Sequence, residues 1–522
     1  MTCSVESIRW ERVLLHLEVR CSGAAKAPVL FLQDTGGRRR FRMRREPADG
    51  RHADGVYGYY INITNPGTCS CIPDGEYRVV SGTGDFAPEE IRADCDTQTA
   101  EKRFYYNSRK DCCICSFGNS PFRFRVRTQS HSAARKLRKT VLGAALTVVY
   151  RIDAAFAGLN GTRRGKKSVL FLSGQSQSPG ANLTAVRDRM RARGLAGDRG
   201  SFRILESYRD RNCGWVDLLR AVHRIAMADY IFLDDHEPLF DYFRLNKDTV
   251  LTQLWHAGVG FKSSGYSRFG LPGGPEPFMC HRQYTWGIVS SKAVIPIFSE
   301  IWGINDAQVL PVGLPRMDRY LDPDYRSRAE KKVRDAFPLI RGKKVILFAP
   351  TYRGKGKGDA AYPYEQIDFA RLYETLGNDA VVLFCMHPWV KRPVPIPEGM
   401  KDRMEDARSV ADINDLFYVT DLLITDYSSA ICEYSLMDRP MLFYAFDEKA
   451  YAKQRGFHRD YQTYAPGKVC HTFDELLEAV KRQDFEQEKA ARYVQEQFDR
   501  RDSGASDRVI DCVLLGKSAA SV

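Results

Sequence analysis

The chain has 522 residues, of which 43% are hydrophobic and 27% charged, so it is long enough for two to four globular domains and is neither fibrous nor largely disordered. Lys and Arg outnumber Asp and Glu by 78 to 65, and this formal charge of +13 favours an anionic partner: nucleic acid, anionic lipid or a phosphate-rich substrate. No stretch approaches the roughly 20 apolar residues of a membrane span. The N-terminus also lacks the pattern of a secretory signal, so we expect a protein on the cytoplasmic side.

Cysteines are concentrated near the N-terminus, where eight of the 14 precede residue 116. In a reducing compartment they are expected to be thiols or metal ligands rather than disulfides. The spacings Cys69-x-Cys71 and 112–115 are not the paired CxxC of a zinc site, so buried or half-exposed thiols are the preferred interpretation.

Residues 1–132 read as a β-rich accessory domain. Short runs that alternate between apolar and polar residues are separated by Gly, Pro and Asp turns, and no long helical period occurs. This pattern predicts a small antiparallel sandwich or barrel.

Residues 133–165 predict a basic amphipathic linker helix. Over 135–167, nine Lys and Arg residues stand against one acid, Asp153, and apolar residues recur with a helical period. Such a helix suits an anionic membrane surface, and the one-sided charge favours that interpretation. The alternative is an ordinary helix that packs its stripe on a neighbouring domain. The stripe comprises Leu137, Val141, Ala145, Val148, Ile152, Phe156 and Leu159.

From residue 166 onward, predicted strands alternate with helices. One βαβ series covers 166–308 and a second covers 309–500, with 501–522 left as a C-terminal tail. Two consecutive series predict an α/β protein with two doubly wound, Rossmann-like domains that face each other across a cleft.

Four polar loops follow predicted strands at the edge where open α/β sheets bind ligands. In residues 422–434, a strand leads through Ser428 and Ser429 into a helix, whose first amides and two hydroxyls could bind a diphosphate. Taken alone, simple N-capping by serine is the better explanation of that motif. Three further loops favour a ligand site over simple capping: 255–258, 349–354 and 386–388. With them, two histidines, an arginine and the serine pair can converge on one cleft.

These motifs, in this order, resemble the CDP-glycerol glycerophosphotransferases, the family of teichoic acid primases and polymerases. The resemblance covers roughly 166–500, and residues 1–130 are only loosely similar to an extra β domain of some members. The matching runs are 255–258, Phe261-Lys262, 265–267, 313–318, 349–354, His387-Pro388, 412–416, 424–429, Arg439-Pro440, Phe443-Tyr444, Asp447, Tyr451, 455–457 and Asp460-Tyr461.

The resemblance implies a two-domain GT-B fold at the cytoplasmic face of the membrane, held there peripherally through basic, amphipathic elements. It implies a CDP-glycerol or CDP-ribitol donor, a lipid-linked acceptor, release of CMP, and no cofactor or catalytic metal. The pair Asp234-Asp235 is accordingly interpreted as loop structure or acceptor-side polarity.

The family's catalytic roles map onto three residues. His256 matches the proposed general base on the acceptor hydroxyl, for which an imidazole pKa near ~6.5 is suitable. His387 matches the histidine that faces the donor phosphates. Arg353 would neutralise phosphate charge, since a guanidinium can bind phosphate bidentately.

The substrate-binding roles map onto five more residues. Ser428 and Ser429 would cradle the pyrophosphate, Thr425 could add a hydroxyl, and Glu433 could reach ribose hydroxyls. Arg316, in the matching run 313–318, is grouped with them.

Two departures affect the finer assignment. Residues 257–260 read Ala-Gly-Val-Gly, where polymerase-like members tend to have Gly-Thr-Pro, and Tyr352 stands where Trp is common. These departures leave primase and polymerase undistinguished.

Two other functions remain as alternatives. One is a GT-B glycosyltransferase that uses a sugar nucleotide. The other is a non-enzymatic basic protein that binds nucleic acid or lipid through stripes such as 38–40, 44–45 and 135–167. No nucleic-acid motif with interleaved aromatic residues accompanies these stripes, so we expect no nucleic-acid partner.

Overall fold

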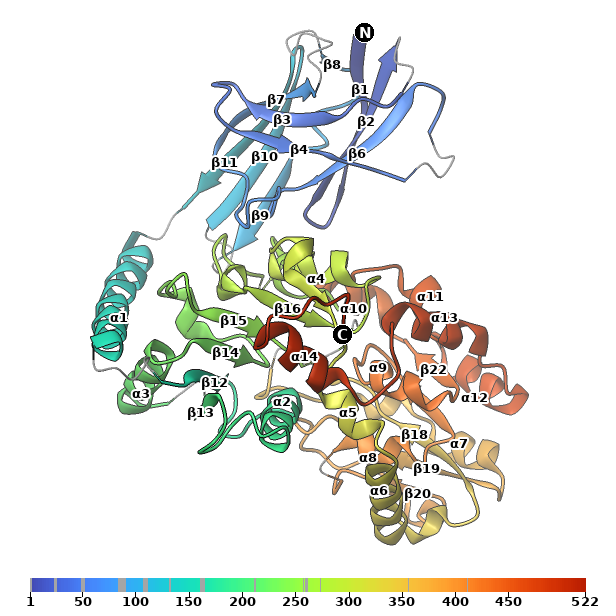
Figure 1. Ribbon diagram of the computed structural model, residues 1–522. Coiled ribbons are helices and arrows are strands. Elements are labelled where there is room, and N and C mark those ends of the chain that lie inside the picture. The colour runs from blue at the N-terminus through green and yellow to red at the C-terminus, as the bar shows by residue number, and fades with distance from the viewer. Residues whose placement is uncertain are drawn as a thin grey trace.

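The computed structural model describes residues 2–22, 26–47, 52–82, 91–106, 111–130, 133–159, 165–210, 213–256, 258, 262–272, 274–354, 356–410 and 412–522. Residues 257 and 259–261 of the first histidine motif, and 160–164 of the expected linker helix, therefore lie outside the described residues. In Figure 1 the β-rich region (blue) lies at one end, the first parallel sheet (green) follows, and the second (orange) lies at the other end.

The β-rich region is a sandwich of two sheets around one apolar core. In FRFRVRTQ, alternation turns Phe122, Phe124 and Val126 inward and the arginines outward. Neighbouring strands are antiparallel, apart from the parallel pair β1–β8. The first sheet has the order β5 (Arg44–Arg45), β6 (Val56–Asn62), β2 (Leu14–Ser22), β1 (Thr2–Glu11), β8 (Arg92–Ala93). The second has the order β4 (Arg40–Arg42), β3 (Leu30–Asp34), β7 (Gly75–Ser81), β11 (Phe122–Gln129), β10 (Asp111–Asn119), β9 (Lys102–Tyr106).

The sandwich is docked on both other parts of the chain. Arg12, in the turn between β1 and β2, donates two hydrogen bonds of 2.7 and 2.9 Å to the Glu300 carboxylate. It donates a third, of 2.9 Å, to the main-chain oxygen of His458. Phe269 stacks on Phe104 and Tyr106 with ring centroids 5.6 and 5.9 Å apart.

The helix α1 (Ala133–Leu159) joins the sandwich to the first parallel sheet and packs along α3 (Trp215–Ala226) (Figure 1). Its buried face holds Leu146, Tyr150 and Ala154, not the expected stripe. The Tyr150 ring stacks on Phe243 at 5.0 Å. The expected stripe points to solvent instead: its members Leu137, Val141, Val148, Ile152 and Phe156 are all more than half exposed.

The first parallel sheet has the order 2-1-3-4-5-6 in its own strands. They are β13 (Phe202–Tyr208), β12 (Lys167–Ser173), β14 (Tyr230–Leu233), β15 (Val250–Gln253), β16 (Trp286–Val289) and β17 (Val309–Pro311). The helices α2 (Ala181–Ala192), α3 and α4 (Ile295–Trp302) accompany it. The expected boundary between 308 and 309 falls too early, because β17 pairs with β16 and completes this sheet.

The second parallel sheet has the doubly wound order 3-2-1-4-5-6. Its strands are β20 (Met404–Asp406), β19 (Ala380–Phe384), β18 (Lys344–Phe348), β21 (Leu422–Thr425), β22 (Met441–Tyr444) and β23 (Lys468–Cys470). The accompanying helices are α5 (Arg316–Tyr320), α6 (Pro323–Ala336), α7 (Phe369–Leu376), α8 (Ile413–Phe417), α9 (Ile431–Tyr434), α10 (Glu448–Arg455), α11 (Tyr461–Tyr464), α12 (Phe473–Arg482) and α13 (Gln487–Gln497). The predicted α/β class with parallel sheets is confirmed.

The segment 501–522 is not a free tail. It contains α14 (Ala505–Val513), which returns to the first sheet and buries Val509 and Ile510 in the same core as Phe171. Arg193 pairs with Asp507 at 3.1 Å and strengthens this contact. The chain therefore crosses between its two parallel sheets twice.

Candidate functional site

A cavity of about 360 Å³ lies between the carboxyl edges of the two parallel sheets. Both halves of the molecule line it, so the arrangement of the two sheets creates it. Six of the eight predicted site residues contribute to its wall: His256, Arg316, His387, Ser428, Ser429 and Glu433.

The His256 loop follows β15 and is held in a strained conformation. Trp255 has a positive φ of 58°, which is rare for a large side chain. Its N–H donates to Gln253 Oε1 (2.8 Å), and its carbonyl accepts from Asn182 Nδ2 (2.6 Å). These two contacts hold the turn that presents His256 to the cavity.

The orientation of the His256 ring follows from one contact. Nδ1 lies 3.1 Å from the main-chain oxygen of Asp234. Because a carbonyl oxygen can only accept, Nδ1 carries the hydrogen when the ring is neutral. Nε2 is then the atom able to take a proton, and the side chain is half exposed. This is the arrangement that a general base requires.

Asp234 lies under that ring and is 7% exposed. Its Oδ1 atom has no hydrogen-bond partner among the described residues. Burial, followed by the neighbouring Asp235 charge, raises the pKa of Asp234 to about 6. Asp235 also lies near the ring, with its Oδ1 atom 3.8 Å from His256 Nδ1.

Ser428 and Ser429 form the opposite wall, but the helix behind them is short. Ser428 Oγ accepts from the Ala430 N–H at 3.2 Å, which is a capping contact. Helix α9 has four residues, so its dipole is small and the expected dipole effect is weak. What remains for an anion is a pair of half-buried hydroxyls on the cavity wall.

His387 lies in an aromatic corner of the same wall. Its ring centroid is 4.8 Å from that of Tyr352 and 5.1 Å from that of Trp389. Burial, with a smaller contribution from Lys262, lowers the pKa of His387. Nδ1 accepts from the Trp389 N–H at 3.2 Å, so in the neutral ring Nε2 carries the hydrogen and can donate it to a phosphate oxygen.

Arg353 is not at the cavity surface, contrary to expectation. Its guanidinium donates to Asp426 at 2.9 Å and to both Asp447 oxygens at 2.7 and 2.9 Å. A further bond of 2.8 Å goes to the Thr351 carbonyl. Because these partners occupy most of its donors, Arg353 supports the loop instead of neutralising a phosphate.

Thr425 is also internal. It is 2% exposed, and its hydroxyl donates to the Ala349 carbonyl at 2.7 Å. This bond ties β21 to the loop after β18, so Thr425 has no free hydroxyl hydrogen for a substrate.

Glu433 and Arg316 contact each other across the cleft. Arg316 also donates to the His256 carbonyl through its side chain and to Asn182 Oδ1 (2.8 Å) through its main chain. Burial raises the pKa of Glu433. The expected ribose contact of Glu433 thus competes with an ion pair that links the wall formed by Ser428 and Ser429 to the His256 loop.

Lys262 was quoted only as part of a motif, yet it lies close enough to His387 for its charge to contribute to the lowered pKa of that histidine. It forms a β-bridge with Phe457, which lies in the second half of the molecule. Burial lowers its pKa to about 8, while the charge of Asp426 opposes that shift. No ion pair of its ammonium is found within the described ranges. A half-buried cation of this kind can attract an anionic ligand.

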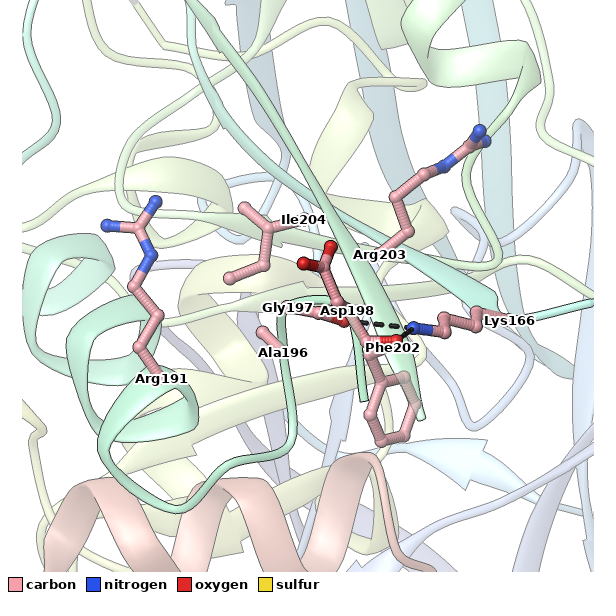
Figure 2. A pocket seen from close by; sticks show the side chains of 8 residues that line it. All are labelled: Lys166, Arg191, Ala196, Gly197, Asp198, Phe202, Arg203 and Ile204. Carbon is pink, nitrogen blue, oxygen red and sulfur yellow. Dashed lines mark hydrogen bonds between the residues drawn. The ribbon is translucent and has the colours of Figure 1, made fainter. Parts of the chain in front are cut away.

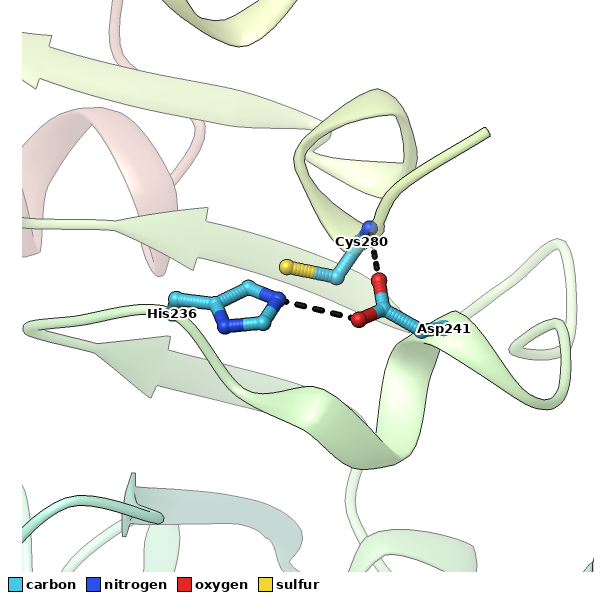
Figure 3. A group of neighbouring side chains, drawn as sticks. All are labelled: His236, Asp241 and Cys280. Carbon is cyan, nitrogen blue, oxygen red and sulfur yellow. Dashed lines mark hydrogen bonds and ion pairs between the residues drawn. The ribbon is translucent and has the colours of Figure 1, made fainter. Parts of the chain in front are cut away.

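Three side chains near the His256 loop could hold a metal ion: His236, Asp241 and Cys280, whose ligand atoms lie within 4.8 Å of one another (Figure 3). The carboxylate of Asp241 already accepts from His236 Nε2 (3.1 Å) and from the Cys280 N–H (2.6 Å). Burial raises the pKa of the Cys280 thiol, which disfavours the thiolate a metal needs. The group therefore acts as an internal hydrogen-bonded brace.

A basic cavity of about 770 Å³ beside β13 does not form a converging site. Figure 2 shows the guanidinium groups of Arg191 and Arg203 on opposite sides of Ile204. The Lys166 ammonium is bound to the carbonyls of Gly197 and Asp198.

Comparisons with known proteins identify the family of the chain. Residues 162–515 match the profile of the family described as CDP-Glycerol:Poly(glycerophosphate) glycerophosphotransferase. The chain is 38% identical over 345 residues to the teichoic acid ribitol-phosphate polymerase TarL of Staphylococcus aureus (strain NCTC 8325 / PS 47), an alignment that covers 66% of this chain and 61% of TarL. It is 28% identical over 286 residues to the teichoic acid glycerol-phosphate primase of Bacillus subtilis (strain 168), with 54% and 72% covered.

Among solved structures, the wall teichoic acid polymerase TagF superposes with a TM-score of 0.54 at 22% identity, over 74% of this chain and 98% of that one. This likeness shows a shared fold. The chain spans about three fifths of the length of TarL.

Proposed function

Because the chain belongs to the CDP-glycerol:poly(glycerophosphate) glycerophosphotransferase family, we propose that it transfers an alditol phosphate from a CDP-alditol to a hydroxyl of a lipid-linked acceptor and releases CMP. The product would be a teichoic acid-like or capsule polymer. The observation that carries this proposal is that His256 and the His387–Ser428–Ser429 wall face one cavity from the two halves of the molecule. The 38% identity to a ribitol-phosphate polymerase makes CDP-ribitol the first donor to test.

In the proposed reaction, the acceptor oxygen attacks the phosphorus that carries the alditol. The bond from that phosphorus to the bridging oxygen breaks, and CMP leaves with the bridging oxygen. The acceptor proton passes to His256 Nε2. Phosphoryl transfer of this kind depends mainly on positioning and on stabilisation of charge.

The wall that holds His387, Ser428 and Ser429, here called the donor wall, would supply that stabilisation. His387 Nε2 and the hydroxyls of Ser428 and Ser429 are donors on the cavity surface, and Lys262 provides a half-buried positive charge near His387. Together they would bind the diphosphate and stabilise the leaving CMP without a metal ion.

The test is donor turnover. The protein is incubated with native membranes and with radiolabelled CDP-ribitol, CDP-glycerol or a UDP-sugar, and release of the nucleotide is measured. We expect CMP and a labelled polymer from one CDP-alditol. Transfer from the sugar nucleotide alone would instead identify a glycosyltransferase.

We further propose that the protein lies peripherally on the cytoplasmic face of the membrane. No helix in the described part of the chain is long and apolar enough to cross a bilayer. The exposed stripe of α1 supports surface attachment, and α3, which packs beside it, adds Trp215, Val216 and Leu219. The exposed apolar side chains of these two adjacent helices suit the boundary of an anionic bilayer.

Vesicle sedimentation tests the attachment. Wild-type protein should pellet with anionic vesicles and be released by high salt. The triple variant Val141→Asp, Val148→Asp, Phe156→Asp should stay in the supernatant, whereas a control with three acidic substitutions on the exposed surface of α12 should pellet normally. Full pelleting of the triple variant would refute attachment through α1.

A further inference from the structure

A separate cavity of about 460 Å³ lies where β13 ends and α3 begins. We propose that this cavity, here called the α3 cavity, binds the phosphate headgroup of the lipid-linked acceptor, an inference that rests on the proposed function. Its wall includes Tyr208, Arg209, Asp217, Arg220 and Arg224.

The position of the α3 cavity is the first argument. The sheet order β13-β12-β14-β15 places its rim at the same carboxyl edge as the His256 loop, three strands away. With neighbouring strands about 4.8 Å apart, the separation along that edge is about 14 Å. A headgroup in the α3 cavity would thus leave room for the hydroxyl-bearing part of the acceptor to extend along the edge to His256.

The apolar surface next to the cavity is the second argument. Trp215 and Val216, in the first turn of α3, are 68% and 61% exposed, and Leu219 is 46% exposed. Arg220 follows Leu219 directly, so apolar and cationic side chains share this part of the helix. An amphipathic ligand with an apolar chain and an anionic head matches this arrangement of an apolar surface beside a cationic one.

The charges of the cavity are the third argument. Arg220 and Arg224 stand four residues apart on one face of α3. Arg220 pairs with Asp217 at 3.2 Å, but both side chains are more than half exposed, and such pairs contribute little. Arg224 donates to the main-chain oxygen of Glu206 and makes no ion pair with another described residue. Both guanidiniums can therefore turn to a phosphate.

The deeper groups define the limits of the cavity. Arg209 is bound through both terminal nitrogens to the buried carboxylate of Glu237. Asp210 accepts from Gln177 Nε2 at 2.7 Å. The Tyr208 ring only borders the cavity, because it packs with α2 on the other face of β13, beside Arg187 and Glu206.

The first experiment uses Trp215 as a built-in reporter. Farnesyl diphosphate is titrated against full-length protein, and the emission of Trp215 is isolated by comparison with a Trp215→Phe variant. We expect saturable quenching by farnesyl diphosphate. Farnesol should quench at least tenfold more weakly, and inorganic diphosphate should compete with farnesyl diphosphate.

The second experiment compares variants. Arg220→Glu with Arg224→Glu should raise the KM for the lipid-linked acceptor at least tenfold and leave the KM for the CDP-alditol unchanged. Arg191→Glu with Arg203→Glu is the matched control, since these arginines line the non-converging basic cavity, and it should change neither KM.

Two outcomes would overturn the inference. One is an unchanged acceptor KM in the Arg220 and Arg224 variant. The other is a Trp215 response that phosphatidylglycerol vesicles saturate and farnesyl diphosphate does not alter, which would identify a general membrane contact. Failure of the proposed function has a different signature: the wild-type protein would turn over no CDP-alditol, whereas the binding titration would still report on the cavity.

Discussion

The Nδ1 atom of His256 lies 3.1 Å from the main-chain oxygen of Asp234, and this contact determines which imidazole nitrogen can accept a proton. The two residues end neighbouring strands, since β14 and β15 pair in parallel. The main chain therefore sets the tautomer, and the Asp234 side chain is left to influence the ring through its charge.

The role of His256 can be tested directly. His256→Ala should lower the rate of transfer by the ~10²–10⁴-fold typical of a general base. CDP-alditol affinity, measured by calorimetry, should change little, because the donor wall belongs to the other half of the molecule. The control is His471→Ala, an exposed histidine paired with Glu448. Near-normal turnover in His256→Ala would rule out the assignment.

The serine pair offers a comparison of ligands. Ser428→Ala with Ser429→Ala removes two hydroxyls from the cavity wall, and a hydrogen bond to a charged group is worth ~1.5–3 kcal/mol. Affinity for the CDP-alditol should fall more than affinity for CMP, which lacks the outer phosphate. Equal weakening of both ligands would mean that the serines only cap the chain, as Ser428 does at Ala430.

Arg353→Gln should lower the free energy of unfolding. The variant leaves Asp426, which is 1% exposed, and Asp447 without their cation, and breaking a buried pair costs ~3–5 kcal/mol. Urea unfolding should show that loss. Arg371→Gln is the control, since its pair with Asp474 is exposed. Unchanged stability with lost donor affinity would restore the direct phosphate role.

The stability of the protein should depend on pH through Asp234. Its folded pKa of about 6 exceeds the ordinary 3.8, so the contribution of the neutral carboxyl is full below pH 4 and is lost as pH rises through 6. The loss amounts to about 3 kcal/mol at pH 7. In urea unfolding, Asp234→Asn should become more stable than wild type as pH rises from 4 to 7. A constant difference would contradict the shifted pKa.

Metal removal tests the chemistry of the donor wall. Activity should persist in excess EDTA, because histidine, hydroxyl and lysine groups supply the donors and positive charge there. If EDTA abolished activity and magnesium restored it, the acids Asp234 and Asp235 and the group His236, Asp241 and Cys280 would become candidate ligands.

The sequence by itself determined much of the fold and part of the site. Alternating apolar residues specify the N-terminal strands, and two βαβ series specify parallel sheets whose carboxyl edges carry the polar loops. These edges meet in one cleft. The positions of His256, His387, Ser428 and Ser429 in loops after strands were therefore enough to predict that they lie together. These are local patterns, which can be predicted from the sequence alone.

The tertiary structure decided which polar groups remain available to a substrate. The sequence predicts Arg353 as a phosphate ligand, but in the structure its N–H groups bind Asp426 and Asp447, which are 73 and 94 residues away. Thr425 loses its hydroxyl to a carbonyl 76 residues away. Conversely, a β-bridge to Phe457 holds Lys262 against the second half of the molecule. The apolar stripe of α1 stays exposed because another face of the helix packs on α3. Such long-range contacts have no local signature, since any loop arginine or helix stripe can be satisfied or left free by residues distant in the chain.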